Sequence, residues 1–219
     1  MPVKTRRLPK KSVSFSDEET LTTRSRQMGD KKRNASHDGP PIYVKPTIKT
    51  VPLHLLALLY YYIKLSQDFD ARTLLYMLIP LQLIYVALQF NANTIYGNKI
   101  SKLRWSLLPI SFAAALVLTV PCMLIIILLG APISMLLKET WLLAAHCCIL
   151  TLPAVYSIFK CNFKVGIFKK YFIAVAIGCW ISCVVIPLDW DRDWQNWPTP
   201  LVVGAYLGAF VGYSIGPYV

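Results

Sequence analysis

The chain has 219 residues, of which 55% are hydrophobic and only 16% are charged. A composition this apolar excludes an ordinary soluble domain and indicates a membrane protein. The net charge of +12 would suit a nucleic-acid-binding protein, but the basic residues gather near the N-terminus and otherwise separate apolar runs, so we predict no nucleic-acid partner.

The N-terminal segment, residues 1–46, is rich in Ser, Thr, Lys, Arg and Pro and lacks apolar periodicity. We predict a disordered, basic tail on the cytosolic side of the membrane. Within it, Lys10–Ser16 is either a kinase target or part of a solvated tail near anionic lipid. The first apolar run begins near Val51, too far along the chain for a secretory signal.

Six apolar stretches follow the tail, separated by short polar loops. A transmembrane helix needs about 20 residues to cross about 30 Å of hydrocarbon, and the first two stretches only just reach this length. We predict an all-α, polytopic membrane domain at 47–219, with six transmembrane helices at about 47–66, 74–90, 106–129, 140–159, 168–188 and 198–218.

The charges of the connecting loops predict the orientation of these spans. If the tail is cytosolic, the cytosolic loops at 91–105 and 160–170 contain seven basic residues and no acidic residue. The loops on the far side contain six acidic and three basic residues. This is the positive-inside pattern, and it fits an even number of spans with both termini cytosolic.

A few polar residues and prolines lie inside the predicted spans. His146, Gln82 and Gln89 predict interhelical hydrogen bonds rather than a proton relay, because no acidic residue lies inside any span. Four prolines predict kinks, which neighbouring helices can tolerate by satisfying the freed carbonyl groups. These are Pro80, Pro109, Pro121 and Pro153.

The loop Pro187–Pro198 is the most polar loop on the far side. If it forms a short helix, Trp190, Trp194 and Trp197 share one face, as in an interfacial helix. The loop then fixes the last hairpin or binds a partner; alternatively, Asp189 and Asp191 hold a divalent cation with a phosphate donor, or the loop contacts lipid headgroups. We predict no catalytic site, because no base, nucleophile or substrate pocket accompanies the aspartates, and no Cys/His spacing fits zinc.

Four glycines recur every four residues in the last apolar stretch: Gly204, Gly208, Gly212 and Gly216. Small residues at this spacing let two helices approach closely, and such packing drives helix association in lipid. The stripe is therefore either an internal packing face or a docking face for a helix of another protein.

Several strings in the chain resemble the PIG-F family. They are Pro187–Arg192 (Pro-Leu-Asp-Trp-Asp-Arg), Trp194-Gln195, Trp197-Pro198 with the glycine-rich stretch after it, Leu129–Pro132 (Leu-Gly-Ala-Pro), and Glu139-Thr140. The resemblance covers the chain from about residue 50 to its end, and departs from the family pattern at Asp193, where proline is expected. It implies a non-catalytic subunit in the endoplasmic-reticulum membrane, which stabilises the ethanolamine-phosphate transferases of glycosylphosphatidylinositol (GPI) anchor synthesis.

From the residues and this resemblance together we expect an accessory subunit without a cofactor, the zinc of the reaction belonging to the catalytic partner. The glycine-striped span is expected to dock the partner. The far-side loop, through Asp189, Trp190, Asp191, Arg192, Trp194 and Trp197, and Glu139 are expected to contact it, with GPI or phosphatidylethanolamine as lipid partners. The rival hypotheses are a lipid-phosphate transferase that uses the far-side aspartates, and a lipid scramblase or carrier.

Overall fold

The computed structural model describes residues 42–215, except for 46, 48–49, 97–98, 101, 133–134, 161–168, 189 and 191. The chain divides into two units, Met1–Pro41 and Ile42–Val219, and all described residues belong to the second. The predicted disordered tail therefore lies outside the described residues, apart from its last few positions. Those positions include a strand, so the folded unit begins before the predicted boundary at residue 46.

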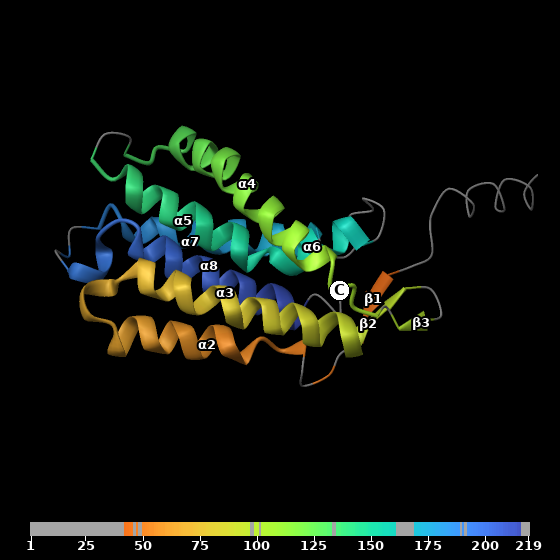
Figure 1. Cartoon of the computed structure of the whole chain (residues 1–219). Helices are drawn as coiled ribbons and strands as arrows, with labels where there is room; N and C mark the ends of the chain where they lie inside the picture. The colour runs from red at the N-terminus through yellow and green to blue at the C-terminus, as the bar shows by residue number, and fades with distance from the viewer. Residues whose placement is uncertain are drawn as a thin grey trace, which may run out of the picture. The chain divides into compact units, whose positions relative to one another are not determined.

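The described residues are mostly helical (Figure 1). The α-helices are α2 (Leu53–Tyr60), α3 (Ala71–Leu88), α4 (Leu107–Leu128), α5 (Leu137–Leu150), α6 (Leu152–Lys160), α7 (Lys169–Ser182) and α8 (Thr199–Ile215). The π-helical segments Tyr61–Leu65 and Gln89–Asn93 prolong α2 and α3, and short 3-10 turns occur at Gln67–Phe69, Cys183–Val185 and Asp193–Gln195.

A small antiparallel sheet corrects the all-α prediction. Its strands, in the order β1-β2-β3, are β1 (Ile42–Val44), β2 (Thr94–Tyr96) and β3 (Lys99–Ile100). Tyr43 pairs with Ile95, and Ile95 in turn pairs with Ile100. The sheet joins the start of the folded unit to the loop between α3 and α4.

Two helical segments are long and apolar enough to cross a membrane, Ala71–Asn91 and Leu107–Leu128. A third candidate is the pair α5 and α6, which meet at an angle of 50°. Leu53–Leu65 and Thr199–Ile215 are apolar but shorter. The described part of this membrane protein thus contains two or three candidate spans, and the count of six stays a prediction.

The break between α5 and α6 follows from Pro153. Proline has no amide hydrogen to give to the carbonyl of Ile149, so the helical ladder ends there. The amide of Ala154 bonds to the Thr151 carbonyl at 2.9 Å instead, which leaves the Leu150 carbonyl without its helical donor. Gln82 Nε2 on α3 donates to it at 2.9 Å, and the Tyr213 hydroxyl on α8 also donates to it.

Of the other prolines, Pro80 and Pro121 lie inside continuous helices, and Pro109 lies in the first turn of α4. A first-turn proline costs no hydrogen bond, because amides there have no helical acceptor. The kink prediction is therefore confirmed at Pro153, where the helix breaks, and stays a prediction at the other three prolines.

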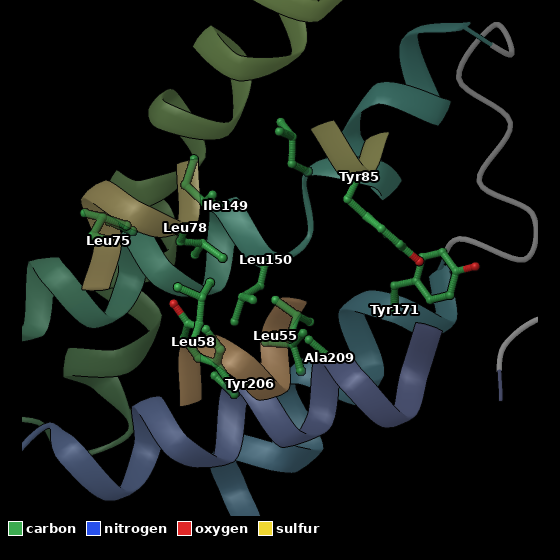
Figure 2. Close-up of a cluster of buried hydrophobic side chains, with 14 of the residues drawn as sticks. Leu55, Leu58, Leu75, Leu78, Tyr85, Ile149, Leu150, Tyr171, Tyr206 and Ala209 are labelled. Carbon is green, nitrogen blue, oxygen red and sulfur yellow. The ribbon is translucent and has the colours of Figure 1, made fainter. Parts of the chain in front are cut away.

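The core lies where α2, α3, α5 and α8 meet (Figure 2). Leu55 and Leu58 of α2, Leu78 of α3, Leu150 of α5 and Ala209 of α8 contribute side chains that are at least 95% buried. By contrast, α4 contacts the bundle mainly through α5 and α6. Only 17% of its most apolar stretch is buried, compared with 44% for the segment Ala71–Asn91 that contains α3. A helix so apolar and so exposed suits a lipid-facing position.

The predicted interhelical hydrogen bonds are confirmed for His146 and Gln82. His146 is fully buried; its Nε2 donates to the Ala71 carbonyl at 2.9 Å, and its Nδ1 accepts from the Tyr206 hydroxyl at 3.2 Å. Gln82 also accepts from His54 Nε2 at 3.0 Å, so one side chain joins α2, α3 and the end of α5. These bonds fix the helices to one another where water is absent.

Candidate functional site

Three loops meet at one end of the helix bundle and line a pocket of about 510 Å³. They are the α2–α3 connection, the start of α5, and the loop before α8, all at the end of the bundle opposite the strands (Figure 1). The pocket lining includes Asp68, Phe69, Asp70, Arg72, Lys138, Glu139, Asp193, Asn196 and Trp197. All three loops are those that the charge pattern assigned to the far side of the membrane.

The α2–α3 connection has an unusual backbone. Asp68 and Phe69 have φ values of 54° and 51°, in the left-handed region that residues other than glycine rarely adopt. This turn places Asp70 immediately before α3, where its carboxylate accepts from the Arg72 amide at 2.9 Å and from the Thr73 hydroxyl at 2.5 Å. Asp70 is therefore the N-cap of α3.

The same hydrogen bonds set the charge of Asp70. The Thr73 hydroxyl, and to a smaller extent the Arg72 amide, stabilise the carboxylate and lower the pKa of Asp70 from its ordinary value. Asp70 therefore keeps its negative charge at neutral pH at the wall of the pocket.

A side-chain hydrogen bond joins the loop before α8 to the start of α5. Trp197 Nε1 donates to the hydroxyl of the buried Thr140 at 3.1 Å. Glu139, which the sequence analysis grouped with the tryptophan loop, precedes Thr140 in the first turn of α5 and lines the same pocket. The structure thus brings together Glu139, Asp193 and Trp197.

The tryptophan loop is not the short helix that would place three indoles on one face. Its described part contains only the 3-10 turn Asp193–Gln195. Trp190 and Trp194 are exposed and pack on each other with ring centroids 5.8 Å apart, whereas Trp197 is half-buried against the bundle. Buried Gln195 holds the loop in this form, because its side-chain amide donates to the Val185 carbonyl at 2.8 Å and to that of Leu188.

The glycine stripe contacts α7 of the same chain. A Cβ at Gly204 would overlap Ser182 Oγ and the Gly178 carbonyl oxygen, and a Cβ at Gly208 would overlap the Ala174 carbonyl oxygen. At Gly212 a Cβ would lie 2.7 Å from that of Ala174. Since α7 contacts Gly204, Gly208 and Gly212, the described part of the stripe is an internal packing face. A docking role for the stripe stays a prediction.

Comparison with known proteins decides the family. The family described as GPI biosynthesis protein family Pig-F matches residues 50–217. The chain belongs to the PIG-F family. It is 58% identical over 214 residues to glycosylphosphatidylinositol anchor biosynthesis protein 11 of Kluyveromyces lactis, with 98% of each chain covered.

Two further relatives have the same name as the Kluyveromyces lactis protein. The protein of the same name from Saccharomyces cerevisiae is 57% identical over 222 residues, with both chains covered completely. That from Debaryomyces hansenii is 33% identical over 193 residues, covering 77% of this chain and 82% of the relative. No solved structure matches the chain.

In this PIG-F chain, two of the segments that carry the family resemblance meet in space. Glu139-Thr140 and Trp197-Pro198 are joined by the indole–hydroxyl bond, and both line or flank the pocket. The α2–α3 loop, with Asp68, completes this pocket, and this role was not predicted from the sequence. The acidic charge of this loop was the only feature of the sequence that could have indicated it.

Some predicted site residues fall outside the described part of this PIG-F protein. They are Asp189, Asp191 and Gly216, while Arg192 is described and exposed. The hypothesis of a cation at Asp189 and Asp191 therefore stays untested. Among the residues that the structure does describe, no group of three or more His, Cys, Asp or Glu side chains is arranged to hold a metal.

Proposed function

We propose that this chain is a multi-pass subunit of the endoplasmic-reticulum membrane that binds and stabilises a catalytic GPI ethanolamine-phosphate transferase. It thereby supports the addition of phosphoethanolamine to GPI mannoses without performing the transfer itself. Membership of the PIG-F family and the names of the curated relatives support the GPI-anchor pathway.

The proposed topology has six spans, with both termini cytosolic. The spans correspond to α2, α3, α4, the bent pair α5 and α6, α7, and α8, with their flanking turns. The separation of charge supports this topology, because the acidic loops gather at the pocket while Lys160 bonds to the Lys102 carbonyl at the other end. In this orientation the basic end faces the cytosol and the pocket faces the lumen.

The observation that carries the docking proposal is the exposed indole pair, Trp190 and Trp194, beside the lumenal pocket. Aromatic side chains are enriched in protein interfaces because they bury a large area with little loss of conformational freedom. With the described part of the glycine stripe covered by α7, this pair is the predicted contact for the transferase.

Co-purification tests the docking proposal. The double variant Trp190→Ala and Trp194→Ala is expected to recover the catalytic subunit from mild detergent at least about tenfold less well than the wild type, as for an interface hot spot. Quantitative mass spectrometry of the eluted complex provides the measurement. Trp105→Ala is the control, because Trp105 is an even more exposed indole at the opposite end of the bundle.

The proposal is contradicted if the double variant folds and retains the transferase at the wild-type level. It is equally contradicted if the purified chain alone transfers phosphoethanolamine, which would favour the lipid-phosphate transferase hypothesis. Lipid movement in proteoliposomes that contain only this chain would instead favour a scramblase.

A further inference from the structure

Thiol side chains from three different helices gather inside the bundle. Cys147 Sγ on α5 lies 3.8 Å from Cys179 Sγ on α7, although the two residues are 32 positions apart in the sequence. The thiol of Cys122 on α4 interacts with the thiols of Cys147 and Cys148. All four cysteines are free in the structure, so the pair Cys147 and Cys179 is two reduced thiols in direct contact.

The thiol pair lies far from both ends of the bundle. Cys179 follows the start of α7 at Lys169 by ten residues, and Cys147 follows the start of α5 at Leu137 by ten residues. At 1.5 Å per residue, each thiol is about 15 Å from the end where its helix begins. In the proposed six-span topology, on which this inference rests, the two helices begin on opposite sides of about 30 Å of hydrocarbon. The thiols then lie near the middle of the membrane.

The surface beside the thiols is open to the lipid. Cys122, Cys147 and Cys179 are half-buried, not enclosed. On α7, the neighbouring side chains of Trp180 and Ile181 expose 76% and 59% of their surface. An oxidant dissolved in hydrocarbon can therefore reach the thiol pair, whereas a charged oxidant from either aqueous side cannot cross the apolar layer.

We propose that Cys147 and Cys179 form a disulfide when peroxyl radicals arise in the acyl chains of the surrounding lipid. One peroxyl radical takes the hydrogen atom of each thiol, and the two radicals become two hydroperoxides. The two sulfur-centred radicals then combine to form the S–S bond, so that the protein loses two hydrogen atoms. Hydrogen-atom transfer suits this position because ionic thiol chemistry needs a thiolate, which apolar surroundings disfavour.

The disulfide would join α5 covalently to the close pair α7 and α8. A bond between residues 32 positions apart restricts the unfolded chain, and should raise the thermal unfolding midpoint by roughly 5–15 °C. The bond would also strengthen the link between the first turn of α5 and the loop before α8, which the Trp197–Thr140 hydrogen bond already connects.

Controlled lipid oxidation of the full-length chain tests this proposal. The chain is reconstituted in vesicles of polyunsaturated phosphatidylcholine and treated with a lipid-soluble azo initiator in air. Peptide mapping by mass spectrometry without reduction should then show the Cys147 peptide joined to the Cys179 peptide, with the rise in unfolding midpoint. A lipid-soluble phenolic antioxidant should prevent both changes. Oxidised glutathione, which is charged and stays in water, should produce neither.

Four alanine variants locate the bond. Cys147→Ala and Cys179→Ala should each abolish the cross-link and the rise in unfolding midpoint, and the second variant serves if the first fails to fold. Cys148→Ala and Cys183→Ala are the matched controls, because each removes a neighbouring thiol in the same region of the bundle. Both controls should retain the cross-link.

Thiols that stay free while the lipid is oxidised would overturn the proposal. A cross-link that joins Cys122 to Cys147 as the main product would also overturn it, as would one that forms with oxidised glutathione but not with the initiator. The outcome is separable from the proposed subunit function, because it is measured on the chain alone without the transferase.

Discussion

At the residue scale, polar side chains in this chain satisfy backbone groups that the helices leave open. Asp70 caps the amides at the start of α3, and Gln82 covers the carbonyl freed at the α5–α6 break. Each side chain lies where an unsatisfied backbone group would lower stability. Asp70 lies at the pocket end of the bundle, and Gln82 lies inside the apolar bundle.

Asp70→Ala should lower the free energy of unfolding by about 1 kcal/mol, the usual contribution of an N-cap. Because folding lowers the pKa of Asp70, the wild-type advantage should be complete above the unfolded pKa of about 3.9. It should disappear as the pH falls through the lower folded pKa. Thermal unfolding of wild type and variant in detergent between pH 2 and pH 7 measures this stability difference, with Asp193→Ala as an exposed control. A difference that grows as the pH falls would contradict the role of Asp70 as the N-cap of α3.

Gln82→Leu should lower the free energy of unfolding by about 1–3 kcal/mol, because it leaves the buried Leu150 carbonyl with one donor fewer and removes the partner of His54. Denaturation with an ionic detergent measures this change. Ser111→Ala is the control, since the Ser111 hydroxyl donates only within its own helix at 2.8 Å. Equal stability of the two variants would show that Gln82 has no bridging role.

At the scale of elements, α7 and α8 form the most extensive contact among the helices that the structure describes. Glycines on α8 allow its backbone to approach that of α7 at Ala174, Gly178 and Ser182. Approach this close maximises van der Waals contact, which is the main attraction between helices in lipid.

Gly208→Ala should lower the free energy of unfolding by about 1–3 kcal/mol, because the added methyl group would overlap the backbone of Ala174. Val211→Leu is the control, since it adds a methylene group on the exposed side of α8. Detergent titration of both variants measures the difference. A neutral Gly208→Ala would mean that α7 and α8 are not packed in this way.

The sequence predicted the helices better than it predicted the contacts between helices. The apolar runs located them and Pro153 located a break, but the strand at Ile42–Val44 was missed, because three residues beside a polar tail carry no clear period-two pattern. Spacing showed that Gly204 and Gly208 form a packing face without identifying the helix that covers it. The pocket was missed for the same reason, since Asp68 and Asp193 meet only through tertiary packing.

At the scale of the whole molecule, one end of the bundle bears the acidic pocket and the exposed indoles, and the other bears basic loops. By the positive-inside rule, this asymmetry supports the proposed orientation. In that orientation, a partner in the lumen would meet only a small set of loops.

Glycosylation reporters test the proposed topology. An acceptor site inserted after Asp193, or between Lys138 and Glu139, should be glycosylated in the endoplasmic reticulum. An acceptor at either terminus, or in the loop at 161–168, should not be. Glycosylation of the 161–168 reporter would require a different number of spans before that loop.

The stability of the catalytic transferase in cells that lack this chain tests the account most directly. A pulse-chase measurement should show the transferase degraded several-fold faster without the chain, and restored by wild-type protein but not by the Trp190→Ala, Trp194→Ala double variant. A transferase with the same half-life and activity in the absence of this chain would contradict the account.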